Sequence, residues 1–145
     1  MAEVNVWGVI RVTKASLPLI RKYQGRIVNV VSMLGRSPVT YSSAYFITKQ
    51  ALEAYTDIFR LEMARFKVGV FTIEPGHFTE ATAIVMNAME DALIRRYPKS
   101  RYFVVSFLDK TIAHFYQFFP TFIYDFITLK ANDIFQSHIA SYKKQ

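Results

Sequence analysis

The stretch SAYFITKQA, residues 43–51, places a phenol and a primary amine four positions apart, on Tyr45 and Lys49. On a helix, these two side chains would lie on the same face, one turn apart. A nearby cation favours the ionised form of a phenol, which can then exchange a proton with an alcohol or a carbonyl. Because the chain contains nine tyrosines, this pair alone is more typical of a surface helix than of an active site.

Helices and strands around this pair must position it. The expected elements are a helix over residues 3–23, a strand over 26–32, a helix over 44–66, a strand over 68–74, a helix over 82–97 and a short strand over 100–107. The first two strands are nearly continuous β-branched runs, which are typical of parallel strands covered on both faces. Pro18 is expected to kink the first helix, and Ser42 or Ser43 to cap the second. This order predicts an α/β fold with two or three parallel strands and flanking helices.

Polar and turn-forming residues lie where the two expected strands end. Ser32 ends the first strand, 13 residues before Tyr45, and Pro75 with Gly76 ends the second. The carboxyl ends of parallel strands border the crevice in which α/β sheets bind ligands. Asn5 lies 27 residues before Ser32, on the first expected helix. The hydroxyl of Ser32 is therefore expected to point into this crevice.

This combination of motifs resembles the short-chain dehydrogenase/reductase family. The matching segments, in order, are VNVWGVIRVTKASLPLI, GRIVNVVSMLGR, YFITK and IEPGHFTEAT. The residues of these segments are similar to those of the branch that holds D-β-hydroxybutyrate, retinol and related hydroxysteroid dehydrogenases. The segment NAMEDALIRRYPKSRYFV resembles the late helix and last strand of that branch. The resemblance implies a partial Rossmann-like parallel sheet and NAD(P)-dependent interconversion of a secondary alcohol, or a retinoid alcohol, and its carbonyl.

Four catalytic roles are implied by the resemblance. Tyr45 would be the general acid and base, and Lys49 would promote its ionisation. Ser32 would hydrogen-bond the reacting oxygen, and Asn5 would hold a water that links Lys49 to solvent. Tyr41 is a weaker candidate for the acid and base, because the residue four positions after it is Tyr45 and not a lysine.

The same resemblance implies a binding site for NAD or NADP, with NAD favoured. Pro75 and Gly76 would lie against the nicotinamide, and either Thr79 or Thr82 would contact its carboxamide. The implied cofactor-binding residues are therefore Tyr45, Lys49, Pro75, Gly76, Thr79 and Thr82.

Two features of the family pattern have no match in this sequence. Five glycines occur, but none forms a glycine-rich phosphate-binding turn, and no substrate-binding lid separates Glu80 from the helix that follows. The sequence is therefore expected to be a truncated member whose activity alone is doubtful. The rival hypothesis is a non-catalytic family member that acts by binding a partner or a membrane surface.

Composition narrows the classes of function further. The chain has 18 Lys and Arg against 11 Asp and Glu, a formal charge of +7, but no basic run exceeds two residues, so we expect no nucleic-acid partner. Cysteine is absent, which excludes disulfides and thiolate metal sites. The histidines have no partners at ligand spacing, so no metal site is expected.

The C-terminal part is rich in aromatic residues. From Tyr102 to Phe126, ten of 25 residues are Phe or Tyr, and charged residues interrupt the run, so it is a poor transmembrane helix. Burial in the fold, burial in a homo-oligomer, or a membrane surface bound through residues 102–130 would each account for it. The division expected is a catalytic half over residues 1–82 and, over 83–145, the late helix, short strand and aromatic segment of the same domain. By resemblance, membrane association in mitochondria or the endoplasmic reticulum is expected.

Overall fold

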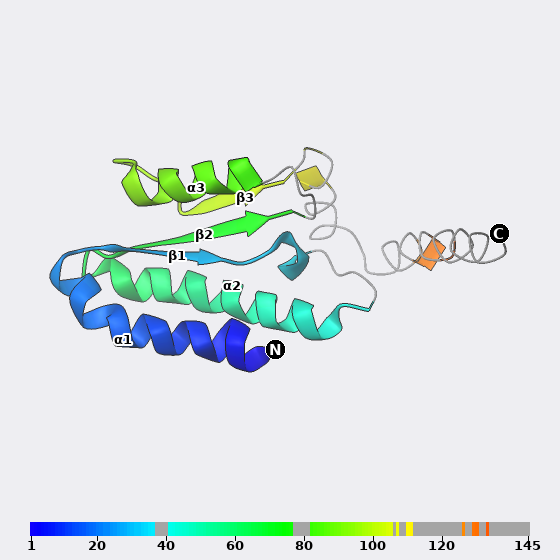
Figure 1. Cartoon of the computed structure of the whole chain (residues 1–145), viewed down its shortest axis with the longest axis horizontal. Coiled ribbons are helices and arrows are strands. Elements are labelled where there is room, and N and C mark those ends of the chain that lie inside the picture. The colour runs from blue at the N-terminus through cyan, green and yellow to red at the C-terminus, as the bar shows by residue number, and fades with distance from the viewer. Residues whose placement is uncertain are drawn as a thin grey trace.

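A computed structural model describes residues 1–36, 41–76 and 82–105, together with residues 107, 110, 111, 126, 129, 130 and 133. Most of the aromatic segment therefore lies outside the described residues. The elements are the π-helix η1 (Glu3–Gly8), α1 (Val9–Lys22), β1 (Arg26–Val30), the 3-10 turn η2 (Met33–Gly35), α2 (Ser43–Ala64), β2 (Gly69–Pro75), α3 (Thr82–Ile94) and β3 (Arg101–Val104) (Figure 1). Each helix and strand that the sequence predicts is present within a few residues of its expected bounds.

The three strands form one parallel sheet in the order β1-β2-β3. Arg26 is in register with Gly69 at the start of the first pair, and Thr72 with Arg101 at the start of the second. β2 is therefore the central strand, as expected for its unbroken run of apolar and β-branched residues. The α/β fold with a parallel sheet is confirmed.

Helices cover both faces of this sheet, with α1 and α2 on one side and α3 on the other (Figure 1). Successive side chains of β2 alternate between the two faces. Phe71 and Ile73 pack with Ala88 and Ala92 of α3, in a cluster that β3 completes. On the opposite face, Val70 packs with a second cluster that includes Phe59 and Met63 of α2. The central strand is thus buried from both sides, as its composition predicts.

The first helix differs from expectation in its geometry. Residues Glu3–Gly8 form a π-helical segment that continues directly into α1. Pro18 lies inside α1, which ends at Lys22. A π-helical turn has the same apolar pattern as an α-helix over so short a stretch, so hydrophobic periodicity did not reveal it. Such turns occur often at functional sites, and this one carries Asn5.

At the start of α2, a serine takes the N-cap position as predicted, but the capping hydrogen bond expected of it is absent. Ser42 occupies the N-cap position, but it makes no side-chain capping hydrogen bond, and Ser43 is the first residue of the helix.

Farther along α2, a side-chain hydrogen bond with Thr13 ties Tyr55 to α1. Burial, the largest influence, raises the pKa of the Tyr55 phenol. Tyr55 therefore serves as a neutral packing residue between the two helices.

One edge of β1 has no strand beside it in the described part of the chain. The carbonyl of Gly25 and the N–H of Val31 both bond to β2. Because main-chain groups alternate in direction along a parallel strand, the N–H and C=O of Arg26, Val28 and Val30 point to the other edge. This edge presents main-chain groups that a further strand could pair with.

Candidate functional site

The candidate residues come together where β1 and β2 end. Ser32 follows β1 by two residues, Pro75 ends β2, and Tyr45 and Lys49 lie on the first two turns of α2. Since β1 and β2 run parallel, their carboxyl ends share one edge of the sheet. The arrangement therefore matches the edge at which the sequence placed a site.

Tyr45 and Lys49 lie in contact with one another, as their spacing predicts. The Lys49 ammonium nitrogen is 5.6 Å from the centroid of the Tyr45 ring, and it donates a long hydrogen bond of 3.5 Å to the carbonyl oxygen of Val30. Both side chains are half-buried. Lys49 therefore spans from α2 to the end of β1 and holds a positive charge beside the phenol.

Asn5 reaches the same helix through a residue that the sequence analysis did not single out. Its side-chain amide nitrogen donates to the hydroxyl of Thr48 at 3.1 Å, and that hydroxyl donates to the carbonyl oxygen of Tyr45 at 2.8 Å. Thr48 is buried, so its hydroxyl is shielded from water. The π-helical segment is thereby fixed to the turn of α2 that carries Tyr45 and Lys49.

Ser32 and Gly76 mark the ends of their strands by backbone geometry. Ser32 is buried, and its carbonyl oxygen accepts from the N–H of Gly35 at 2.9 Å, which closes the turn η2. Gly76 donates its N–H to Val104 at 2.8 Å. A Cβ at Gly76 would lie 3.1 Å from a methyl of Val105, so a larger residue would require the Val105 side chain to shift by a few tenths of an ångström.

The remaining predicted positions are distributed differently. Thr82 is the first residue of α3 and is exposed, whereas Thr79 lies outside the described residues. Tyr41 has 89% of its surface exposed and a left-handed backbone with φ of 65°, in a turn before α2. Tyr41 therefore does not belong to the helix that carries Tyr45 and Lys49, in agreement with its lower rank.

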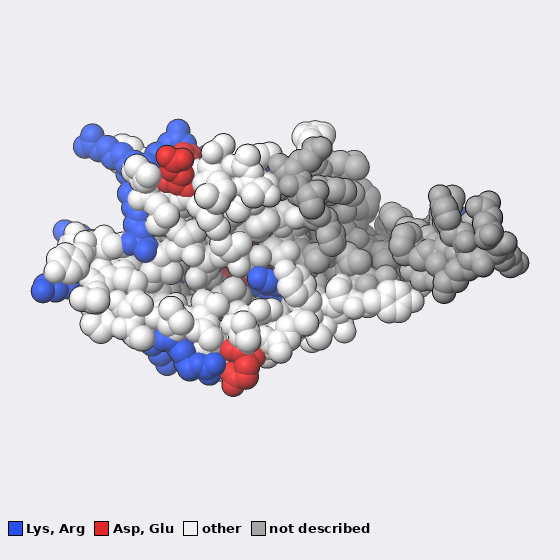
Figure 2. Space-filling view, in the orientation of Figure 1, with Lys and Arg blue, Asp and Glu red and all other residues white. Residues whose placement is uncertain are grey.

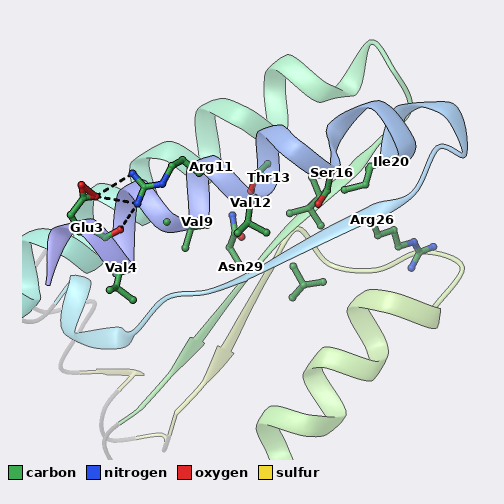
Figure 3. Close-up of a pocket in the computed structure, with 13 residues that line it drawn as sticks. Glu3, Val4, Val9, Arg11, Val12, Thr13, Ser16, Ile20, Arg26 and Asn29 are labelled. Atoms are coloured by element: carbon green, nitrogen blue, oxygen red, sulfur yellow. Dashed lines mark hydrogen bonds and ion pairs between the residues drawn. The ribbon is translucent and has the colours of Figure 1, made fainter.

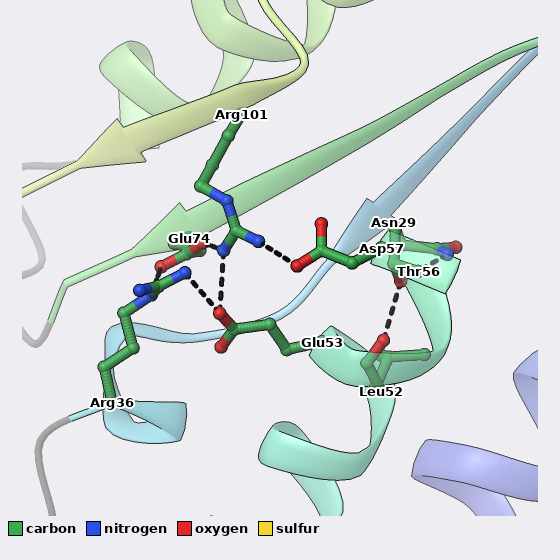
Figure 4. Close-up of polar contacts among 8 residues, drawn as sticks. All are labelled: Asn29, Arg36, Leu52, Glu53, Thr56, Asp57, Glu74 and Arg101. Carbon is green, nitrogen blue, oxygen red and sulfur yellow. Dashed lines mark hydrogen bonds and ion pairs between the residues drawn. The ribbon is translucent and has the colours of Figure 1, made fainter. Parts of the chain in front are cut away.

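An ion cluster that the sequence analysis missed lies beside this edge (Figure 4). It comprises Arg36, Glu53, Asp57, Glu74 and Arg101. Glu74 is fully buried and accepts from both arginines: from Arg36 Nε at 2.8 Å and from the Arg101 guanidinium. A glutamate inside the buried run VGVFTIE was the available signal, because a buried carboxylate requires a cationic partner.

Burial and the neighbouring charges of opposite sign act in opposite directions on the pKa of Glu53 and on that of Arg101. Burial, reinforced by the charge of Glu74, raises the pKa of Glu53 although Arg36 and Arg101 oppose the rise. Burial acts to lower the pKa of the Arg101 guanidinium, but Glu74 and Glu53 outweigh it, so that the pKa lies above its ordinary value. Arg101 therefore remains charged, and Glu53 accepts a proton more readily than an ordinary glutamate does.

A groove of about 690 Å³ lies elsewhere, between the first helices and the free edge of β1 (Figure 3). Glu3 and Arg11 pair at one rim at 3.2 Å, and Asn29 and Arg26 of β1 border it below. None of the candidate site residues lines this groove. It therefore belongs to the open strand edge and not to the Tyr45 site.

Charged side chains are unevenly distributed on the face shown in Figure 2. In Figure 2 most Lys and Arg side chains lie toward the end where the strands begin, and much of the face in view is uncharged. Among the described residues, no group of histidine, aspartate and glutamate side chains could hold a metal ion. Nor does any helix within those residues have the length and apolarity needed to cross a bilayer. The site therefore offers a phenol, an ammonium, a hydroxyl and backbone groups.

Comparison with known protein families finds one match over most of the chain. Residues 1–92 match the family described as short chain dehydrogenase. Mitochondrial D-beta-hydroxybutyrate dehydrogenase of Bos taurus is 51% identical over 84 residues, which are 58% of this chain and 24% of that protein. Retinol dehydrogenase 16 of Homo sapiens is 46% identical over 79 residues, which are 54% of this chain and 25% of that protein. The chain thus spans about a quarter of the length of these relatives.

Solved structures agree on the fold. A short chain dehydrogenase from Burkholderia cenocepacia in complex with NADP aligns with a TM-score of 0.65 at 23% identity, over 79% of this chain and 53% of that one. A short-chain dehydrogenase from Streptomyces avermitilis aligns with a TM-score of 0.52 at 30% identity, over 71% and 33%. The parallel sheet and its covering helices are therefore those of a Rossmann-like dehydrogenase fold.

Proposed function

This chain belongs to the short chain dehydrogenase family, and from that premise we propose that it carries the proton-transfer side of an NAD(P)-dependent oxidoreductase. The substrate would be a secondary alcohol or the corresponding ketone. One observation carries the proposal: the Lys49 ammonium lies 5.6 Å from the Tyr45 ring, at the edge where two parallel strands end. In the family role that the resemblance implies, a lysine beside a tyrosine assists the exchange of a proton between the tyrosine and an alcohol.

Each residue of the site has a distinct role in this proposal. Tyr45 Oη takes the hydroxyl proton during oxidation and returns it during reduction. Lys49 assists this proton exchange, and Ser32 donates a hydrogen bond to the reacting oxygen. Asn5, anchored on Thr48, holds a water through which Lys49 exchanges its proton with solvent. These roles rest on family resemblance and on the positions described above.

The residues at this edge fit one end of the cofactor. An ammonium and a phenol can hydrogen-bond a ribose diol, and Gly76, confined by Val105, presents backbone without a side chain where a flat ring could approach. Pro75 and Gly76, with Thr79 or Thr82, would line that ring. When bound, the nicotinamide supplies the acceptor or donor of hydride at the substrate carbon. Binding, orientation and proton transfer are the contributions of this chain.

The substrate class follows from the similarity to named relatives. The bovine protein that is 51% identical is named a D-beta-hydroxybutyrate dehydrogenase, and others are named for 17-beta-hydroxysteroids or retinol. We therefore place D-3-hydroxybutyrate first, with NAD as the favoured cofactor. On the same ground we propose a mitochondrial location, since the bovine relative is named as mitochondrial, with the endoplasmic reticulum as the alternative.

The experiment that tests this proposal supplies the dinucleotide-binding half from a relative. Residues 1–145 would be joined to that half of the bovine D-beta-hydroxybutyrate dehydrogenase, and oxidation of D-3-hydroxybutyrate, a 17β-hydroxysteroid and retinol would be followed with NAD and with NADP. Turnover of the first substrate with NAD is expected. Failure with every pair of substrate and cofactor would reject the enzymatic proposal. Liposome co-sedimentation or oligomerisation of the intact chain would then favour the non-catalytic hypothesis.

A further inference from the structure

The ion cluster beside the site joins the three segments that carry Ser32, the Tyr45 and Lys49 pair, and Pro75 with Gly76. Arg36 follows the turn that begins at Ser32, and Glu74 immediately precedes Pro75. Glu53 lies one helical turn after Lys49 and two turns after Tyr45, so all three share one face of α2. Each of the three segments thus contributes one charged side chain to a single network.

The contacts within this network bridge elements and not neighbours in sequence. Arg36 donates to Glu53 of α2 and, through Nε at 2.8 Å, to Glu74 of β2. Arg101 of β3 donates to the same Glu53 oxygen at 2.8 Å and to the other Glu74 oxygen. Two guanidinium groups therefore hold two carboxylates between them, and the four side chains are buried or nearly so. Asp57, with 43% of its side chain exposed, adds a contact at the rim.

We propose that Arg36, Glu53, Glu74 and Arg101 are positioning residues, which set the placement of Tyr45 and Lys49 relative to Ser32 and Gly76. This inference rests on the proposed function. A guanidinium is planar and fixes the direction of each N–H, so a carboxylate bound to two of them has little freedom to move. Arg36 thereby fixes the separation of α2 from the end of β2.

The turn η2 shows how tightly these segments are packed together. A Cβ built on Gly35 would lie 3.3 Å from Glu53 Oε2 and 3.4 Å from the backbone carbonyl carbon of Lys49. The backbone after Ser32 therefore rests directly on the turn of α2 that links Lys49 to Glu53. A change in the direction of Glu53 would move this backbone and the lysine together.

Stability alone is a poor explanation for charges in this place. Apolar side chains of similar size often stabilise a buried position as well as an ion pair does, or better. What an ion network adds is fixed distance and direction, because each hydrogen bond has a narrow range of geometry. Reaction geometry is sensitive to displacements of about 1 Å, so such fixing is useful beside reacting groups.

The test uses the intact 145-residue chain and two variants, Glu74→Gln and Arg36→Lys. Glutamine keeps the shape of Glu74 without its charge, and lysine keeps the charge of Arg36 but cannot span two carboxylates. Asp57→Asn is the matched control, since it removes a charge from the same cluster at its exposed rim. The first readout is the backbone amide resonance of Tyr45 in both variants, with that of Ser32 added in the Glu74 variant and that of Gly76 in the Arg36 variant. The second readout is the affinity of each protein for reduced nicotinamide mononucleotide.

The proposal predicts that both variants shift the reporter resonances and weaken nicotinamide mononucleotide binding by about tenfold or more, while Asp57→Asn changes neither. Lower thermal stability with unchanged resonances would overturn it, as would an equal effect of Asp57→Asn. If Glu74→Gln does not fold, Arg36→Lys decides alone. Absence of binding by the unmodified chain would count against the proposed function, and the resonances would still decide the positioning role.

Discussion

Thr48 provides a direct test of how α2 is held at the site. Its hydroxyl accepts from Asn5 at 3.1 Å and donates to the Tyr45 carbonyl at 2.8 Å. The same arrangement recurs two turns later, where the Thr56 hydroxyl accepts from Asn29 at 2.9 Å and donates to the Leu52 carbonyl at 2.7 Å (Figure 4). Replacement of either threonine by valine removes only the hydroxyl chemistry, and Thr56 lies farther from Tyr45.

The expected losses follow from these contacts. Each hydrogen bond contributes about 1 kcal/mol net, so Thr48→Val should lower the free energy of unfolding by about 1–2 kcal/mol. Thr56→Val should cost more, about 2–5 kcal/mol, because it also leaves the buried amide of Asn29 without this acceptor, a penalty of about 1–3 kcal/mol. Asn5 is only half-buried, so water can replace its lost acceptor.

Urea denaturation of the two variants and the unmodified chain measures these differences. Nicotinamide mononucleotide affinity, measured on the same samples, separates stability from positioning. We expect Thr48→Val to weaken binding more than Thr56→Val does, although it costs less stability. The reasoning would be refuted if Thr48→Val cost more stability than Thr56→Val, or if binding followed stability alone.

Three further predictions concern the core, the ion cluster and the open edge. Ile73→Ala, at a fully buried position of β2, should lower the free energy of unfolding in urea by about 2–5 kcal/mol. Ile58→Ala, at a position that is 59% exposed, should change it by no more than about 0.5 kcal/mol. Equal losses in the two variants would contradict the layer arrangement. Because burial raises the pKa of Glu53, the folded state holds its proton more tightly, and this contribution to stability is lost as pH rises through the raised value. Denaturation of Glu53→Gln should therefore show a penalty that is largest near pH ~4 and shrinks toward pH ~7, and a penalty that grows with pH would contradict the assignment. The amide of Ile27 points toward β2, whereas that of Val28 points to the open edge. In hydrogen exchange, Val28 should therefore exchange faster than Ile27, and the reverse order would contradict the open edge.

The sequence predicted the elements because each signal was local. Nearly continuous β-branched runs identified β1 and β2, and Pro75 with Gly76 marked the end of the second strand. The Tyr45 and Lys49 pair was found from helical spacing, and the contact between the two side chains agrees with that spacing. These features depend on residues that are close in the chain.

Contacts between distant residues escaped prediction. Asn5 and Thr48 are 43 positions apart, and Arg101 and Glu53 are 48 apart, so no periodicity joins them. A buried glutamate in a strand signals that some cation is near, but sequence cannot say which of 18 lysines and arginines it is. The packing of the sheet decides that choice.

The most direct measurement of the central claim compares two tyrosines that are four residues apart. In the protein joined to the bovine dinucleotide-binding half, turnover of D-3-hydroxybutyrate would be measured for Tyr45→Phe and for Tyr41→Phe. If Tyr45 is the proton-transfer residue, Tyr45→Phe should lower turnover by roughly 10²–10⁴-fold, and Tyr41→Phe, at an exposed turn position, should leave it unchanged. Full turnover in the Tyr45→Phe protein would contradict the assignment of proton transfer to Tyr45.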